Sequence, residues 1–227
     1  MIDMVQVPPL YHGTDAKFVV LPENIRQDYK TACFNMINLF LPRFHQFFLK
    51  SEEDVAKAFQ ADSLEEDPSI LSNFQRSLSE VELSSQGCGD FQYEHFYVTS
   101  NWLQACMYAK DSFVGGELAR HAYNFLRAAK YMGMLDDPQN KAIEGFYQAM
   151  NRIASEEPKP IIFTFNDIRP DDLLTEQGEK IDRFVRQDGR IAGINSFRLL
   201  KKPTLNINHA KYIDFDQEIA NYSNKSH

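Results

Sequence analysis

Two short segments of the chain hold residues whose types and order could serve chemistry. One is Tyr11-His12-Gly13-Thr14, and the other spans residues 96–109 and contains Tyr97 and Tyr108. A histidine can exchange a proton near neutral pH, and tyrosine rings offer large, rigid faces to a flat ligand. Taken alone, each segment also fits ordinary structure: a strand that ends in a turn, and a strand that leads into a helix. The functional hypothesis therefore depends on the order and spacing of both.

More familiar reactive motifs are missing from the sequence. There is no glycine-rich phosphate loop, no serine nucleophile elbow and no His-Glu-x-x-His pair. Gly115-Gly116 lacks the Lys and Ser/Thr of a phosphate loop, so we expect it to interrupt a helix. A Cys-His nucleophile stays an alternative at Cys88, which lies in a glycine-bounded loop. No metal is expected, because ligand spacing is absent at His45, His95, His121 and His209.

Together the two segments resemble the ADP-ribosyltransferase superfamily, in its His-Tyr-Glu class of diphtheria-like toxins and poly-ADP-ribose polymerases. That class has a Tyr-His-Gly-Thr/Ser strand, then a Tyr that opens a strand-to-helix segment and a second Tyr in the helix. Residues 160–165 (PIIFTF) and 170–174 (PDDLL) resemble its later strand and the turn that follows. The resemblance implies an α+β fold with a split β-sheet core and NAD as a substrate.

The resemblance also implies a role for each residue. Tyr97 and Tyr108 would sandwich the nicotinamide ring, while the backbone of Gly13 holds its carboxamide at close range. His12 and Thr14 would hydrogen-bond a ribose hydroxyl. The bond between ribose and nicotinamide breaks through an oxocarbenium-like state, so catalysis consists of positioning and charge stabilisation.

The glutamate of the class has no clear counterpart here. The apolar pattern of residues 194–200 puts Asn195 or Ser196 where that Glu belongs, and Gln187, Glu176 and Glu179 are further candidates. We therefore take His12, Tyr97, Asn195 and Ser196 as the candidate catalytic residues. The resemblance then implies a mono-ADP-ribosyltransferase that modifies a protein side chain. The alternatives are a catalytically degenerate NAD-binding or protein-interaction module of the same fold, and a relative that modifies nucleic acid.

Charge and composition narrow the choice of partner and compartment. The chain has 227 residues and a formal net charge of −8, and its basic clusters are short, which makes nucleic acid an unfavoured partner. The three cysteines are too scattered for a disulfide framework and indicate free thiols. Neither a cleaved signal nor an apolar run of about 20 residues is visible. We expect a soluble protein without a membrane partner, either cytoplasmic or exported into a host cell without a cleaved signal peptide.

The elements that must position these residues follow from periodicity. Apolar residues recur at helical spacing over residues 33–48, where Pro42 should kink or divide the helix, and over 70–81; another helix should start at Ser51. We therefore predict a helical insertion at residues 25–85, within an NAD-binding core formed by residues 1–24 and 86–227.

The core itself should be strand-rich at both ends. Gly-Thr-Asp after His12 is turn chemistry, so His12 should lie at a strand end. Further strands are predicted at residues 94–99, 160–165, 190–200 and 205–215. Between them we predict a helix capped by Ser100 or Asn101 and helical stripes over 118–129 and 143–150.

Overall fold

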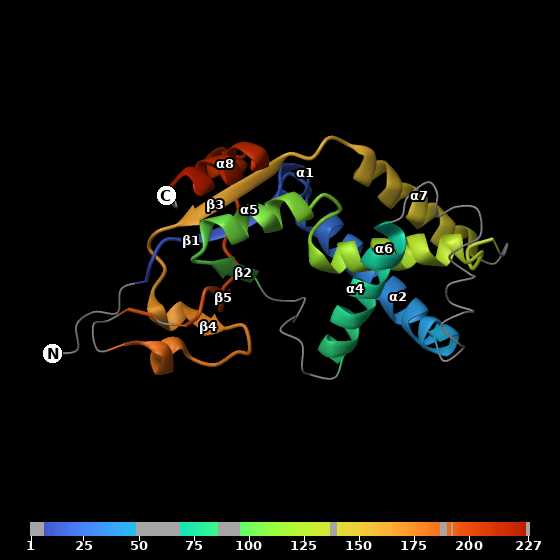
Figure 1. Cartoon of the computed structure of the whole chain (residues 1–227), viewed down its shortest axis with the longest axis horizontal. Helices are drawn as coiled ribbons and strands as arrows, with labels where there is room; N and C mark the ends of the chain where they lie inside the picture. Colours follow the sequence, from blue (N-terminus) through green and yellow to red (C-terminus); the bar gives the residue numbers. More distant parts are fainter. Residues whose placement is uncertain are drawn as a thin grey trace. The chain divides into compact units, whose positions relative to one another are not determined.

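The computed structural model describes residues 7–48, 69–85, 96–136, 140–186, 190–191 and 193–225. They form a mixed α+β structure with a six-stranded antiparallel sheet, which confirms the predicted fold class at that level. The chain divides into two compact units, each made of segments distant in sequence (Figure 1). Unit 1 contains Met1–Val20, Asp90–Phe113 and Pro158–His227, and unit 2 contains Leu21–Gly89 and Val114–Glu157.

Unit 1 is built around the sheet, whose strands run in the order β4-β5-β2-β1-β3-β6. The strands are β1 (Leu10–Asp15), β2 (Phe96–Thr99), β3 (Pro160–Phe165), β4 (Leu173–Thr175), β5 (Ser196–Leu199) and β6 (Lys211–Tyr212). The helices of this unit are α1 (Ala16–Val19), α5 (Trp102–Asp111) and α8 (Phe215–Lys225), with the 3₁₀ turns η2 (Pro170–Asp172), η3 (Ile181–Phe184) and η4 (Ile207–His209).

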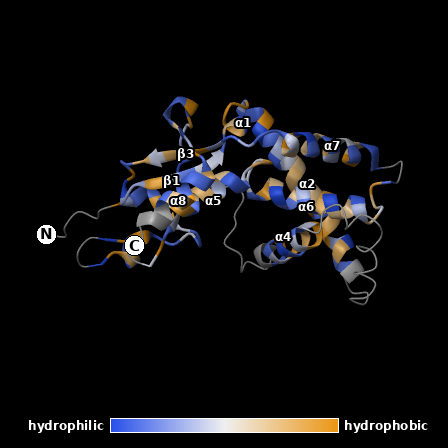
Figure 2. Cartoon of the chain, turned by 45° about the horizontal axis from the view of Figure 1, so that its top comes forward, coloured by the Kyte–Doolittle hydropathy of each residue, from blue (hydrophilic) through white to orange (hydrophobic). Residues whose placement is uncertain are grey.

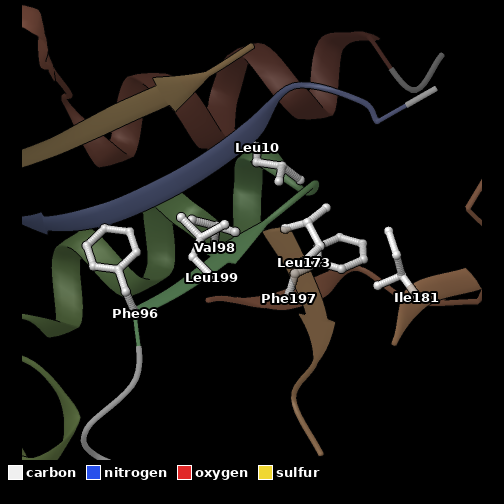
Figure 3. Packing of buried hydrophobic residues seen from close by; sticks show 7 residues of the cluster. All are labelled: Leu10, Phe96, Val98, Leu173, Ile181, Phe197 and Leu199. Atoms are coloured by element: carbon white, nitrogen blue, oxygen red, sulfur yellow. The ribbon is translucent and has the colours of Figure 1, made fainter. Parts of the chain in front are cut away.

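Each face of the sheet has its own apolar cluster. On one face, side chains from β1, β2, β4, β5 and η3 pack together (Figure 3); they are Leu10, Phe96, Val98, Leu173, Ile181, Phe197 and Leu199. On the other face α5 lies along β1, and its Ala105, Cys106 and Ala109 pack with Ile162 and Ile213. The alternation of strand side chains thus separates an apolar layer from a layer that supports a helix.

His12 lies inside β1 and not at a strand end, so that prediction was wrong. β1 continues through Gly13 and Thr14 to Asp15, and His12 is in register with Phe163 of β3. The glycine serves close packing rather than a turn: a Cβ at Gly13 would lie 1.9 Å from the carbonyl oxygen of Ala105 in α5. Real Cβ atoms do not approach so closely, and only glycine lets α5 rest on the β1 backbone.

The late strands are shorter than the apolar pattern predicted. Within residues 190–200, only Ser196–Leu199 forms the strand β5, and residues 187–189 and 192 lie outside the described part. Within residues 205–215, η4 precedes the two-residue strand β6. β5 has partners on both edges, whereas β6 pairs with β3 alone and ends the sheet. Pairing, more than local propensity, sets these lengths.

Unit 2 is helical and consists of α2 (Glu23–Phe48), α4 (Ser69–Ser85), α6 (Glu117–Tyr131) and α7 (Lys141–Ser155). Figure 2 shows hydrophilic and hydrophobic residues mixed along these helices, as expected for helices with one buried face. α6 packs on α2 and α4, and the rings of Phe44, Phe74 and Phe125 make mutual edge contacts in its core. Pro42 lies inside α2, which continues past it as one helix.

The predicted insertion, residues 25–85, falls within unit 2 but does not account for all of it. Unit 2 also includes Val114–Glu157, because α6 supplies Phe125 and Leu126 to the same core as α2 and α4. The helix expected to start at Ser51 lies outside the described residues. None of the described helices combines the length and the apolar character needed to cross a membrane.

Candidate functional site

The pairing between β1 and β2 is the local feature that could admit a ligand. These strands share one register pair, Tyr11↔Thr99, whereas β1 pairs with β3 along its full length. The next register pairs of a regular antiparallel ladder would be His12↔Val98 and then Gly13↔Tyr97, the pair that would exchange hydrogen bonds, and the strands form neither. β1 and β2 therefore diverge at the residues that the sequence singled out.

His12 takes the place of the missing ladder bond. Its Nδ1 lies 2.9 Å from the carbonyl oxygen of Tyr97, and its ring packs against that of Phe96 with the centroids 4.2 Å apart. Because a carbonyl can only accept, Nδ1 must donate, and in the neutral ring Nε2 is then the acceptor nitrogen. His12 is half-buried, so the contact with Tyr97 fixes both its orientation and its tautomer.

The backbone of Gly13 is directed toward this divergence. The amide of Ala16 donates to the carbonyl of Lys159 at 2.9 Å, which continues the β1–β3 ladder and shows that the even-numbered residues of β1 bond to β3. Hydrogen-bonding direction alternates along a strand, so Gly13 turns its N–H and C=O toward the β2 side. A donor and an acceptor thus stand side by side where the β1–β2 ladder has ended.

α5 begins beside this point and carries Tyr108. Asn101 caps the helix, with its side chain accepting from the backbone amide of Gln104 at 3.2 Å. This confirms the predicted cap and its reason, a side-chain oxygen that satisfies a first-turn amide. Tyr108 is 42% exposed, and its ring can be removed without emptying the core.

Gln104 connects two of the predicted residues and was itself missed. Its Nε2 donates to the hydroxyl of Tyr108 at 3.1 Å and to Oγ of Ser196 at 3.2 Å, and its Oε1 accepts from Oγ1 of Thr99 at 2.9 Å. The helical i,i+4 spacing of Gln104 and Tyr108 was visible in the sequence, but the link to Ser196 was not. These three bonds tie α5, β2 and the start of β5 together.

Asn195 and Ser196 contribute different groups to the site, a main-chain carbonyl and a side-chain hydroxyl. Ser196 pairs with Thr99 in the β2–β5 register, so both side chains lie on the face that α5 covers. Asn195 contributes its main-chain carbonyl, which accepts from the amide of Ser100 at 2.8 Å and lies 2.7 Å from Oγ1 of Thr99, whose single proton it shares with Oε1 of Gln104. Its side chain is exposed. The position predicted for a glutamate thus holds a hydroxyl bound to Gln104.

The sheet does not bring all the predicted residues to one side. Tyr97 lies on the same face as Thr99, whereas His12 and Thr14 point to the opposite face, alongside Phe96. The further candidates lie elsewhere: Glu179 pairs with Arg183 at 3.7 Å in the β4–η3 turn, Glu176 lies in the same turn, and Gln187 is outside the described residues.

Arg198 is a second residue that sequence reasoning missed. It is the cross-strand partner of Tyr97 in β5, which places a positive charge beside that tyrosine on the same face. A Cβ at Gly178 would lie 2.8 Å from Nη2 of Arg198, so the guanidinium packs against that glycine. Only the register reveals this neighbourhood.

The described cysteines are poor candidates for nucleophiles. Cys33 and Cys106 are free and buried. Burial raises the pKa of the Cys106 thiol to about 11 and that of Cys33 to about 12, so both stay protonated near neutral pH. Cys88 lies outside the described residues, and the alternative nucleophile there stays a hypothesis.

Compared with models of protein families, with curated proteins and with solved structures, the chain gives no significant match to any of them.

Proposed function

We propose that unit 1 binds NAD where β1 and β2 diverge and transfers a single ADP-ribose unit to a protein side chain, with release of nicotinamide. The observation that carries this proposal is the ladder that stops after Tyr11↔Thr99 while Gly13 turns its N–H and C=O toward the β2 side. A primary carboxamide offers the complementary acceptor and donor on one small planar group. The nicotinamide carboxamide fits this description.

Two further features support a dinucleotide with a flat, electron-poor ring. Tyr97 lies in β2 beside the divergence, and the hydroxyl of Tyr108 accepts from Gln104, so we assign these two rings to the two faces of the nicotinamide. Arg198 beside Tyr97 supplies a positive charge for the diphosphate. In this proposal His12 holds a ribose hydroxyl through Nε2, because Nδ1 is engaged by Tyr97.

The chemistry proposed is positioning and charge stabilisation. Cleavage of the bond between ribose and nicotinamide needs no enzyme nucleophile, but chain elongation needs a base that activates a hydroxyl of a bound ADP-ribose. Ser196, whose Oγ accepts from Gln104, is a poor base near neutral pH. We therefore propose single transfer, onto an acceptor nucleophilic enough to react without that base.

The presence of Ser196 at the position expected for a glutamate favours a second candidate, an NAD-binding module without transferase activity. A hydroxyl in the place of a carboxylate removes the group that would orient both the ribose and the acceptor. The two functions share the binding site and differ only in whether NAD is consumed.

Calorimetric titration of NAD against tyrosine variants tests the binding site. Tyr108→Ala should weaken binding by about 1–3 kcal/mol, the scale of a lost buried aromatic contact, and Tyr108→Phe should keep most of the affinity because the ring remains. Tyr212→Ala is the matched control, since Tyr212 is 58% exposed on β6 of the same unit. Equal NAD affinity in the folded Tyr108→Ala protein and the wild type would refute the site.

Incubation with NAD labelled in the adenine ring separates the functions. Label on protein, with intact mass showing one added unit, supports mono-ADP-ribosyl transfer. Binding of NAD without transfer would favour the NAD-binding module. Label on nucleic acid would mean that the acceptor is a nucleic acid and not a protein. Ladders of added units would mean that a carboxylate reaches the site after all.

A further inference from the structure

Three side chains with metal-binding atoms converge in unit 2, apart from the candidate site of unit 1. Glu80 comes from α4, and Glu117 and His121 come from α6 at i,i+4 spacing, so they share one helix face. One ligand atom of each lies within 4.8 Å of those of the other two. Nε2 of His121 is 3.5 Å from Oε2 of Glu80 and 3.8 Å from Oε1 of Glu117.

His121 is the unusual member of this group. Its side chain is 1% exposed, and neither ring nitrogen has a hydrogen-bond partner among the described residues. A buried polar group is nearly always satisfied, so an imidazole left with two unsatisfied nitrogens calls for an explanation. Nε2 points at two carboxylate oxygens that are close but do not meet hydrogen-bond geometry. An ion placed between the three ligand atoms would satisfy Nε2 and the two carboxylate oxygens, while Nδ1 gains no partner from it.

We propose that Glu80, Glu117 and His121 bind a divalent transition-metal ion of the Zn²⁺ type. Zinc takes imidazole nitrogen and carboxylate oxygen at about 2.0–2.2 Å in tetrahedral geometry, which puts neighbouring ligand atoms about 3.4 Å apart. The separations of 3.5 and 3.8 Å between Nε2 and the two oxygens are within a few tenths of an ångström of that spacing. The fourth position is left to water.

The protonation state of the imidazole supports this assignment. Burial, followed by the positive charge of Arg120, lowers the pKa of His121 to about 4. The ring is therefore neutral at physiological pH, which is the form that binds metals. A histidine held neutral beside two carboxylates loses no proton when a cation arrives.

Two arginines oppose a cation at this site: Arg76, whose Nε donates to Oε1 of Glu80 at 2.8 Å, and Arg120. Nη2 of Arg120 lies 3.2 Å from Oε2 of Glu80 and 3.2 Å from Oε1 of Glu117, the oxygens that face His121. Each carboxylate oxygen has two acceptor directions, so it can keep the arginine bond and still bind a metal, as carboxylate ligands commonly do. The charge of Arg120 nevertheless weakens the site, and its removal should tighten metal binding.

Zn²⁺ titration of the whole, metal-free chain by calorimetry tests the proposal. We expect one ion per chain and at least tenfold weaker binding in Glu117→Gln and in His121→Gln. Glu117 is 25% exposed, so its variant should fold even if the buried histidine cannot be replaced. His45→Gln is the matched control, because His45 and Glu82 form an exposed pair in the same unit. Affinity in this variant should be unchanged.

Two further measurements make the assignment specific. Co²⁺ in place of Zn²⁺ should give the visible bands of a low-coordinate nitrogen and oxygen site, without the near-ultraviolet charge-transfer band of a thiolate ligand. Arg120→Gln should bind Zn²⁺ several-fold more tightly than the wild type. A thiolate band, equal affinity in Glu117→Gln and the wild type, or no tightening in Arg120→Gln would each overturn the site. These results do not depend on NAD binding by unit 1.

Discussion

Replacing Gly13 with alanine tests directly how β1 carries the candidate site. The added Cβ would lie 1.9 Å from the carbonyl oxygen of Ala105 and 2.7 Å from the amide nitrogen of Ala109. Both atoms belong to the backbone of α5, so no side-chain rotation can relieve the clash. Because a carbon–oxygen contact needs about 3.3 Å, the helix must move by about 1.4 Å.

The cost of that movement can be set against the gain from stiffening the unfolded chain. Gly→Ala stabilises a protein by at most about 1 kcal/mol through the unfolded state, whereas overpacking a core costs about 1–3 kcal/mol and occasionally more. Because helix backbone atoms move aside less readily than side chains, we expect a cost at the upper end of the range for overpacking. The free energy of unfolding should fall by about 2–3 kcal/mol, a large share of the roughly 5–15 kcal/mol of a typical domain.

The assay is denaturant unfolding followed by tryptophan fluorescence. Trp102 is the single tryptophan of the chain and lies in α5, so its emission reports on unit 1. Gly145→Ala is the matched control: nothing lies within 4 Å of the new Cβ, and Gly145 is exposed inside α7. The free energy of unfolding of that variant should rise by about 0.5–1 kcal/mol. Because Gly145 lies in unit 2, its unfolding is followed by circular dichroism. If Gly13→Ala unfolds at the wild-type denaturant concentration, α5 does not rest on Gly13.

Three other substitutions probe separate parts of the fold. Asn101→Ala removes the cap of α5 and should cost about 1 kcal/mol in denaturant unfolding; no loss would mean that another group satisfies the first-turn amides. Phe197→Ala empties a fully buried position in β5 and should cost about 3–5 kcal/mol, so a loss below 1 kcal/mol would contradict the packing of Figure 3. His121 should make stability depend on pH, since burial and Arg120 lower its folded pKa to about 4. Between pH 6.5 and 4 the unfolded state then binds a proton that the folded state does not. With chelator present, the unfolding free energy should fall by up to about 3 kcal/mol as pH drops through this window, and His121→Gln should remove that slope.

Part of the candidate site was predictable from the sequence because it depends on neighbours along the chain. Asn101, as a typical N-cap residue, predicts the start of α5, and the i,i+4 spacing puts Gln104 and Tyr108 on one side of that helix. Tyr97 on a strand just before that helix follows from the same segment. The bond from Gln104 to Ser196 does not, because it joins residues distant in sequence.

The turn predicted at Gly13 shows why local sequence composition can mispredict structure. Gly-Thr-Asp has the composition of a turn, yet the chain stays extended through Asp15 because β3 pairs with every residue of β1 and α5 needs a position without a side chain. The same residues in a peptide would have no helix above them and no strand beside them. His12 was likewise misplaced, since its contact with Tyr97 exists only once β2 has come alongside.

The sequence by itself predicted the α+β class and the helices α2, α4, α5, α6 and α7, because apolar periodicity, caps and β-branched runs act over a few residues and survive in almost any context. It did not predict α8, whose first residue was assigned to a strand over residues 205–215. The tertiary structure alone decided the register of β1, β2 and β5, the place where a ladder ends, and the meeting of Glu80 with His121. Each of these depends on which distant segments pack together, and that choice is made by the burial of the whole core rather than by any local stretch.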